Sequence, residues 1–372
     1  MVAILEKRDL RDFDWLTAVL AIAIAAFGVW QIHNALPSEG YWSKQIYGIG
    51  IALVAFVIVA FTDYRRLIEL APFFYVIGLI LLLLVLTPLG VTRNNQKAWL
   101  ALPLIGQFQP SEFVKIPTVL MLAKYLGARK AGSLRLKEML IGGAIFAGPV
   151  ALIMLEPDAG QAITYFPILA AVFFLSGIKI RYVVLAIVGV AIFVPAAYVG
   201  GVKSGMIKRY QQERINAIID PDSVDPRGYG YHTIQSTITV GKGGLAGIQG
   251  ETETSQSVLK FLPEPHTDFI FAVTAENTGF IGCVSLLLAY ALLLSRMIAG
   301  ARQASDRAGM LVIMSIVCGM VFQIFMNIGM ALGILPVIGV PLPLMSAGLS
   351  AILSTFVAIG FVVSVKLRRF VN

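Results

Sequence analysis

Long apolar runs alternate with short polar connections along almost the whole chain. A helix that crosses a bilayer needs about 20 mainly apolar residues. Ten runs approach or reach that length, and they lie near residues 15–33, 45–62, 68–88, 112–126, 139–155, 160–177, 182–200, 269–295, 309–334 and 347–365. The pattern predicts an all-α polytopic membrane protein in which residues 1–372 form a single transmembrane domain of about ten helices.

The connection between the seventh and eighth runs, residues 201–267, is much longer than the others. Loops longer than about 15 residues are usually functional or disordered, and this one mixes aromatic, aliphatic and charged residues. Residues 207–219 have apolar positions at rough helical spacing with basic residues between them, which is typical of an interfacial amphipathic helix. Residues 232–240 predict a second short helix. We therefore expect one large exterior loop that carries short interfacial helices.

Composition and charge support this architecture. The chain is 58% hydrophobic and only 13% charged, whereas a soluble domain carries about 25% charged residues. Lys and Arg gather in alternate connections, as expected for the cytoplasmic side of a membrane. These connections and the two tails contain Lys7, Arg8, Arg11, Arg65, Arg66, Lys124, Arg129, Lys130, Arg135, Lys137, Lys179, Arg181, Arg296, Arg302, Arg307, Lys366, Arg368 and Arg369. We therefore expect both termini in the cytoplasm. The net charge of +8 mostly reflects this orientation signal, so we expect no nucleic-acid partner.

A single carboxylate, Asp268, stands where the polar loop enters the eighth apolar run, in the segment FLPEPHTDFIFAVTAENTGFIG at 261–282. Ionisable residues at membrane depth are rare and are functional by default. An acid in this place is suited to a substrate that is part lipid and part water-soluble, so Asp268 is the main catalytic candidate. A metal site formed by Asp268 and His266 is also possible, because hard cations bind carboxylate oxygens, but the spacing is not diagnostic.

Two further sites place charged residues at or near membrane depth. Glu112 and Lys115 are three residues apart, so a helix presents them on one face. They form a buried ion pair that holds helices together, line a polar cavity that receives a substrate head group, or do both. Glu156 and Asp158 lie in EPDAGQA, where the sequence is compatible both with a tight exterior turn and with Asp158 pointing into a central cavity.

Basic residues of the exterior loop are candidate phosphate ligands, since Arg and Lys are the usual partners of phosphate groups. Arg209, Arg214 and Lys242 belong to this set. A solvated surface, or attraction to anionic lipid, would produce the same composition. The glycine-rich stretch at 241–247 does not match the GxxxxGK[ST] nucleotide pattern, and tight backbone packing or a hinge explains it better.

Four segments together resemble the shape, elongation, division and sporulation (SEDS) family. They read QPSEFVK at 109–115, EPDAGQA at 156–162, LPEPHTDFIFAVTAENTGFIG at 262–282 and NIGMALGILPVIGVPLPLMSAGLS at 327–350. The resemblance covers nearly the whole chain and leans towards the members that serve cell elongation and rod shape. It implies a peptidoglycan glycan-strand polymerase in the bacterial cytoplasmic (inner) membrane. In that reaction the 4-hydroxyl of one lipid II attacks the anomeric carbon of another lipid-linked glycan on the exterior side, and polyprenyl diphosphate leaves.

The resemblance also assigns residues and partners. Asp268 matches the family's essential aspartate, and Glu112 and Lys115 match its intramembrane polar pair. Arg209 and Arg214 lie where the family's loop is basic. The segment that begins at Ser346 reads SAGLS where the family usually has SYGGS, and Glu156 replaces a usual glutamine.

A class B penicillin-binding protein (a transpeptidase) and other membrane proteins of the elongation complex are the implied partners. A divalent cation, Mg²⁺ or Mn²⁺, or a basic residue would stabilise the departing diphosphate, and no organic cofactor is expected. The alternatives are a lipid II flippase and a non-catalytic scaffold for a transpeptidase. A transporter, however, needs no base at the exterior interface.

Overall fold

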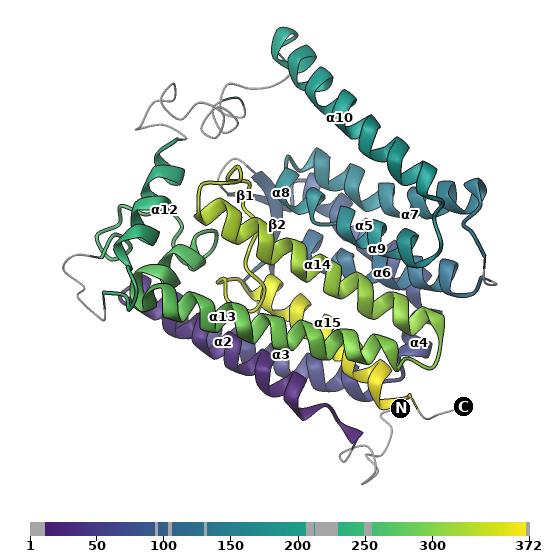
Figure 1. Ribbon diagram of the computed structural model, residues 1–372, viewed down its shortest axis with the longest axis horizontal. Helices are drawn as coiled ribbons and strands as arrows, with labels where there is room; N and C mark the ends of the chain where they lie inside the picture. Colours follow the sequence, from purple (N-terminus) through teal and green to yellow (C-terminus); the bar gives the residue numbers. More distant parts are fainter. Residues whose placement is uncertain are drawn as a thin grey trace.

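The computed structural model describes residues 12–93, 96–102, 106–129, 132–205, 212, 230–248 and 255–369. They form an elongated helical bundle (Figure 1). The first part contains α2 (Trp15–Ala35), α3 (Tyr41–Phe61), α4 (Tyr64–Glu69), α5 (Ala71–Leu86), α6 (Pro110–Gly127), α7 (Leu136–Leu155), α8 (Ala159–Ile163), α9 (Phe166–Leu175) and α10 (Ile180–Lys203). The second part contains α12 (Gly230–Lys242), α13 (Ile270–Arg302), α14 (Arg307–Ala331) and α15 (Leu349–Leu367).

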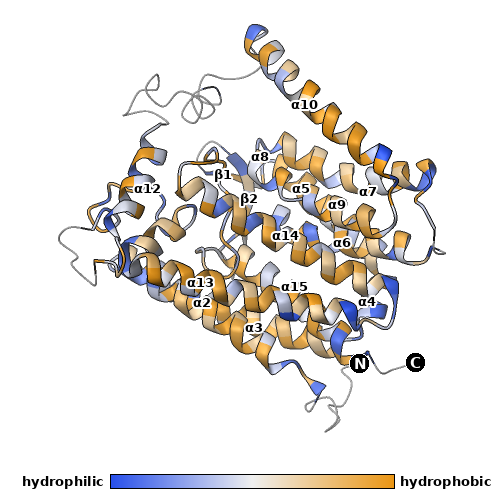
Figure 2. Ribbon diagram, in the orientation of Figure 1, coloured by the Kyte–Doolittle hydropathy of each residue, from blue (hydrophilic) through white to orange (hydrophobic). Residues whose placement is uncertain are grey.

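The predicted polytopic membrane architecture is confirmed. Within the described residues, seven helices are long and apolar enough to cross a membrane, and the stretches Ala71–Leu86 and Ala159–Leu175 are shorter apolar helices. Hydrophobic residues run along the helices of the bundle, and hydrophilic residues gather towards its two ends (Figure 2). Each of the ten apolar runs contains helical residues. The exact number of crossings stays a prediction.

A small antiparallel sheet, which the sequence analysis did not predict, forms in the connection between α5 and α6. Its strands are β1 (Gly90–Arg93), β2 (Gln96–Leu102) and β3 (Gly106–Phe108), in the order β1-β2-β3. Gly90 pairs with Leu100, and Leu100 pairs with Phe108. The strands are too short to show a clear alternation of apolar and polar residues, so the sequence offers only weak evidence for them.

The described part of the long connection between α10 and α13 packs closely against α13. Helix α12 confirms the short helix predicted at 232–240, while the amphipathic helix predicted at 207–219 falls almost entirely outside the described residues. Backbone bonds join the glycine-rich stretch to a break in α13: Phe280 N donates to Gly244 O at 2.9 Å, and Gly279 has a φ of +66°. A Cβ on Gly243 would lie 1.8 Å from Ala275 O. Tight backbone packing therefore explains these glycines.

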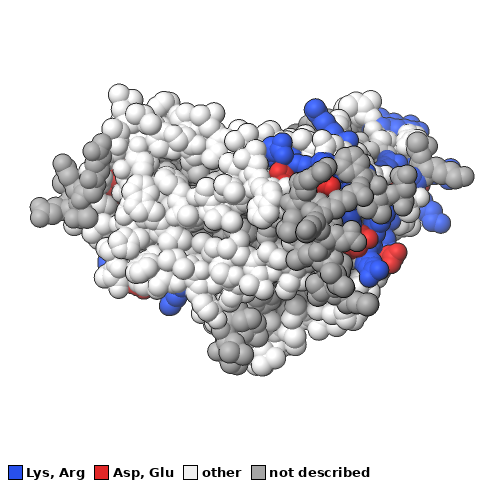
Figure 3. All heavy atoms as spheres, turned by 90° about the horizontal axis from the view of Figure 1, so that it is seen from below, with Lys and Arg blue, Asp and Glu red and all other residues white. Residues whose placement is uncertain are grey.

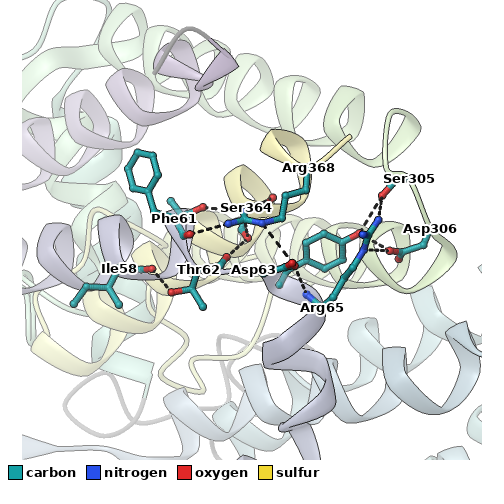
Figure 4. Close-up of polar contacts among 11 residues, drawn as sticks. Ile58, Phe61, Thr62, Asp63, Arg65, Ser305, Asp306, Ser364 and Arg368 are labelled. Carbon is teal, nitrogen blue, oxygen red and sulfur yellow. Dashed lines mark hydrogen bonds and ion pairs between the residues drawn. The ribbon is translucent and has the colours of Figure 1, made fainter. Parts of the chain in front are cut away.

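A dense polar network joins the helices at the end of the bundle where α15 terminates. Arg368 donates to the Phe61 carbonyl at 2.7 Å and forms an ion pair with Asp63 at 3.6 Å, and Arg65 pairs with Asp306 at 3.3 Å (Figure 4). Lys and Arg side chains also gather at this end on the face shown in Figure 3. This asymmetry is what the cytoplasmic side of a membrane protein is expected to show.

The most buried ion pair of this network joins the two ends of the sequence. Asp14 precedes α2 and accepts hydrogen bonds from Lys366, near the end of α15, and from Arg296 in α13 at 2.9 Å. The Asp14 and Lys366 side chains are 3% and 7% exposed, whereas Arg296 is 37% exposed and reaches solvent. Lys366 therefore depends on Asp14 to compensate its buried charge.

Asp14→Ala should lower the free energy of unfolding by about 3–5 kcal/mol, because it leaves the Lys366 ammonium buried without a counter-charge. Thermal unfolding of the purified protein in detergent measures the loss. A second change, Lys366→Met, should restore much of it, and Glu39→Gln, which breaks the exposed pair with Lys260, should have little effect. Equal melting temperatures for wild type and Asp14→Ala would contradict the role given to this pair.

Candidate functional site

A cavity of about 920 Å³ lies at the opposite end of the bundle from the polar network. Its walls come from the beginnings of α3, α6 and α15, from the three strands, and from the segment that precedes α13. Four predicted site residues line it: Asp268, His266, Glu112 and Asp158. Residues that are up to 156 positions apart in the sequence, Glu112 and Asp268, therefore share one chamber.

Asp268 stands at the wall of this chamber, two residues before α13 begins. A Cβ on Gly339 would lie 3.6 Å from the Asp268 carboxylate oxygen Oδ2, so the loop before α15 approaches the carboxylate closely. The main chain of Asp268 is also held, because its carbonyl accepts a hydrogen bond from the Asn327 amide of α14 at 2.9 Å.

The floor of the cavity is a buried polar network around Glu112. This carboxylate is 3% exposed and accepts hydrogen bonds from Lys115 Nζ at 3.1 Å, from Gln161 Nε2 at 2.6 Å and from Ser354 Oγ at 3.5 Å. The structure shows the ion pair and the cavity wall, and the binding of a substrate head group there stays a prediction. Glu112 and Lys115 form a buried ion pair, and Glu112 also lines the cavity. Both residues line a second, mainly apolar pocket of about 60 Å³ below it.

Asp158 lies beside this network, in the turn between α7 and α8 and outside the apolar spans. Its carboxylate caps α8 through Gln161 N at 3.0 Å and accepts a bond from Gln109 Nε2 at 2.9 Å. The turn and the cavity functions again coexist. Burial raises the pKa of Asp158 to about 6, and the negative charge of Glu112 adds to this effect.

Glu156, in the same turn, is fully buried. Within the described residues, neither of its carboxylate oxygens has a hydrogen-bond partner. Burial, with a smaller contribution from the charge of Asp158, raises its pKa to about 8. The side chain is therefore mainly protonated at neutral pH.

The rim of the cavity carries the cations. Of the described residues that line the cavity, one is a lysine, Lys44, and one is an arginine, Arg93. Arg93 Nη2 is 3.9 Å from Glu264 Oε2, and Lys44 lies 5.7 Å from the centre of the Tyr41 ring. The ring centroids of Tyr41 and His266 are 4.0 Å apart, with an angle of 30° between the ring planes. Burial lowers the pKa of His266 and favours its neutral imidazole.

The other predicted site residues lie elsewhere. Lys242 is exposed at the end of α12 and does not line the cavity. Ser346 is buried outside the cavity lining, and its hydroxyl donates to the Thr267 carbonyl at 2.6 Å. Arg209 and Arg214 fall outside the described residues. Lys44 and Arg93 were not predicted as site residues, because their place at the cavity depends on how α3 and the sheet fold over it.

The described part of the chain contains no group of three or more His, Cys, Asp or Glu side chains arranged to hold a metal ion. Asp268 and His266 share the cavity but do not form such a set. The divalent cation stays a prediction, and no step of the mechanism below depends on it.

Comparison with known proteins places the chain in a family. Residues 13–369 match the family FTSW_RODA_SPOVE, described as cell cycle protein, and the chain therefore belongs to this family. The SEDS resemblance is confirmed. The peptidoglycan glycosyltransferase MrdB of Escherichia coli (strain K12) is 37% identical over 352 residues, which cover 94% of this chain and 92% of the relative. Stage V sporulation protein E of Bacillus subtilis (strain 168) is 33% identical, with 94% and 93% covered.

Solved structures agree with this assignment. A chain from a structure described as the coordination of polymerization and crosslinking by a peptidoglycan synthase complex matches with a TM-score of 0.82 and 34% identity, covering 97% of this chain and 99% of the other. The rod shape determining protein RodA of Thermus thermophilus matches with a TM-score of 0.72 and 28% identity, covering 97% and 98%. The helical fold is therefore shared over nearly the full length.

The buried Glu156 carboxyl predicts a pH dependence of stability. In the unfolded chain its pKa is near 4.5, and in the folded protein it is about 8. Between these values only the folded state keeps the proton, so stability falls as the pH rises through this window. Glu156→Gln should flatten the fall of the melting temperature between pH 5 and pH 8. Glu39→Gln should not, because Lys260 lowers the pKa of Glu39. If the melting temperature depended on pH in the same way for wild type and Glu156→Gln, Glu156 could not be a buried acid that is neutral in the folded protein.

Proposed function

We propose that this protein is a peptidoglycan glycosyltransferase that polymerises glycan strands from lipid II. The observation that carries the proposal is the shared cavity, in which the Asp268 carboxylate faces the same chamber as the Glu112–Asp158 floor and the Lys44–Arg93 rim. Relatives named peptidoglycan glycosyltransferases, aligned over 94% of the chain, support the reaction class.

In the proposed reaction Asp268 is the general base. The 4-hydroxyl of lipid II approaches the anomeric carbon of the lipid-linked glycan, and its proton passes to the Asp268 carboxylate. The oxygen lone pair forms the new glycosidic bond while the bond from the anomeric carbon to the diphosphate oxygen breaks. The polyprenyl diphosphate departs with that electron pair. A positioned base contributes about 10²–10⁴-fold to the rate of such a step.

The charges of the cavity suit the two parts of the substrate. The acidic floor offers hydrogen-bond acceptors for sugar hydroxyls. The leaving diphosphate is anionic, and Lys44 and Arg93 are the rim cations able to bind it. Arg93 Nη2 is 3.9 Å from Glu264 Oε2, which is a long distance for an ion pair. A phosphate oxygen therefore competes with a weak partner for the Arg93 guanidinium. Basic residues of the exterior loop, Arg209 and Arg214 among them, would add to this attraction.

A flippase is the weaker alternative. A transporter must open its binding site to both sides of the membrane, whereas the polar network around Arg368 and Asp306 closes the end of the bundle opposite the cavity (Figure 4). Buried, hydrogen-bonded charges such as Asp14 and Lys366 resist separation. We therefore propose one-sided access, with the active site on the exterior face of the bacterial inner membrane and both termini in the cytoplasm.

A crosslinking partner fits the same proposal. The similar solved chain comes from a complex described as coordinating polymerization and crosslinking. We propose that a class B penicillin-binding protein crosslinks the strands that this protein makes, together with other membrane proteins of the elongation complex. A scaffold without catalytic function would not need a carboxylate in an open cavity.

Asp268→Asn should reduce lipid II polymerisation by the purified protein, assembled with its partner, at least about 100-fold, because the amide cannot take the hydroxyl proton. Gel analysis of glycan products measures the loss, and an unchanged melting temperature shows that folding is retained. Normal polymerisation by this variant would refute the catalytic assignment. Translocation of fluorescent lipid II across liposomes holding the protein alone would favour the flippase.

Lys44→Gln should raise the KM for lipid II roughly tenfold with little change in kcat, the result of losing about 1.5 kcal/mol of charge-assisted hydrogen bonding to the diphosphate. Lys44→Arg should keep a near-normal KM. Lys260→Gln is the matched control, since Lys260 pairs with Glu39 and does not line the cavity. An equal KM for Lys44→Gln and wild type would remove Lys44 from the substrate site.

A further inference from the structure

Three successive carbonyl groups lead up to the catalytic carboxylate, and each accepts a hydrogen bond from a different donor. The His266 carbonyl accepts from Ala347 N at 2.8 Å. The Thr267 carbonyl accepts from Ser346 Oγ at 2.6 Å, and the Asp268 carbonyl accepts from Asn327 Nδ2 at 2.9 Å. The donors come from α14 and from the loop before α15, so the segment is held from outside its own helix.

Asn327 makes the most informative of these contacts. Its side chain is fully buried, and its single amide nitrogen donates both to Asp268 O and to Val340 O, each at 2.9 Å. An amide NH₂ has two hydrogens, and both carbonyls lie within bonding distance of it. Asn327 therefore ties the backbone of the catalytic residue to the loop that walls the cavity.

This tie determines what surrounds the carboxylate. Val340 directly follows Gly339, the residue whose ideal Cβ position is 3.6 Å from Asp268 Oδ2. Ser346 reinforces the arrangement, since its hydroxyl also accepts a hydrogen bond from Leu342 N at 2.8 Å. The Asn327 amide and the Ser346 hydroxyl, neither of which lines the cavity, therefore both contribute to the spacing between the carboxylate and the cavity wall.

We propose that Asn327 is a positioning residue for Asp268, with Ser346 in a supporting role. Asn327 acts through the main chain of Asp268: it touches no substrate, and it holds the carboxylate against the Gly339 wall at the place where the acceptor hydroxyl must arrive. The proposal rests on the proposed function, in which Asp268 takes that proton. Displacing a reacting group by about 1 Å costs about 10²-fold in rate.

A purely structural role would have a different signature, and the chain offers a matched control for it. Asn277 in α13 donates to Gln31 Oε1 of α2 at 2.9 Å. This contact also joins two elements through an asparagine amide, but it involves none of the three carbonyls. Loss of either amide should lower stability, because each removal leaves an acceptor without its donor.

The test compares Asn327→Ala with Asn277→Ala in the full chain assembled with its partner. Both should lower the melting temperature. Asn327→Ala should also reduce kcat for lipid II polymerisation about 100-fold with an unchanged KM, because only the geometry of the base changes. Asn277→Ala should keep both constants. An unchanged kcat for Asn327→Ala, or a reduced kcat for both variants, would overturn the proposal.

Asn327→Asp covers the case in which the alanine variant fails to fold, since it preserves side-chain volume but cannot donate two hydrogen bonds. It too should lower kcat at constant KM, and a normal kcat would overturn the positioning role. The Asn327→Asp and Ser346→Ala effects on kcat should be less than additive, because both changes release the same segment. Asp268→Asn separates the two levels of failure. If it is active, the proposed base is wrong; if it is inactive while Asn327→Asp is normal, only the positioning role is wrong.

Discussion

The requirement that buried backbone groups be hydrogen-bonded shapes the end of the molecule that contains the cavity. Where a chain enters a membrane bundle without being helical, its carbonyls need partners that lipid cannot supply. Residues 266–268 lie in such a place, and they find their donors on Ala347, Ser346 and Asn327. Satisfying these carbonyls also positions the backbone of Asp268, so in the proposed function one set of hydrogen bonds serves both stability and catalysis.

The two ends of the bundle solve opposite electrostatic problems. At one end, buried charges such as Asp14 and Lys366 are paired directly, which holds the helices together. At the other end Glu112 and Asp158, each held by hydrogen bonds, line the cavity floor, and Lys44 and Arg93 line the rim. In the proposed function Arg93, which is 3.9 Å from Glu264, exchanges this loose protein contact for a substrate contact, whereas the buried Asp14–Lys366 pair stays closed.

Much of this architecture is readable from the sequence because it depends on local patterns. Apolar runs of membrane length predict the helices, and their basic flanks predict which end faces the cytoplasm. Glu112 and Lys115 pair because helical spacing alone brings them together. Asp268 is also visible in the local pattern, because it is a single acid at the point where the polar loop meets the next apolar run.

The rest depends on contacts between distant segments, which no local pattern reveals. Gln45 donates to the Ser346 carbonyl across 301 residues, and Asn327 reaches Asp268 across 59. Ser346 was a candidate cavity residue because it begins the SAGLS segment of the family resemblance, yet its hydroxyl donates to the Thr267 carbonyl. Arg93 could not be recognised as a rim cation without the unpredicted sheet that carries it.

The most direct test is a structure of the Asp268→Asn variant with its partner and lipid II in a lipid bilayer disc. The account predicts sugar density in the outer cavity, with the acceptor 4-hydroxyl within about 2.6–3.2 Å of the residue 268 side chain and the diphosphate beside Lys44 and Arg93. Sugar bound outside this cavity, with residue 268 facing only protein, would contradict it.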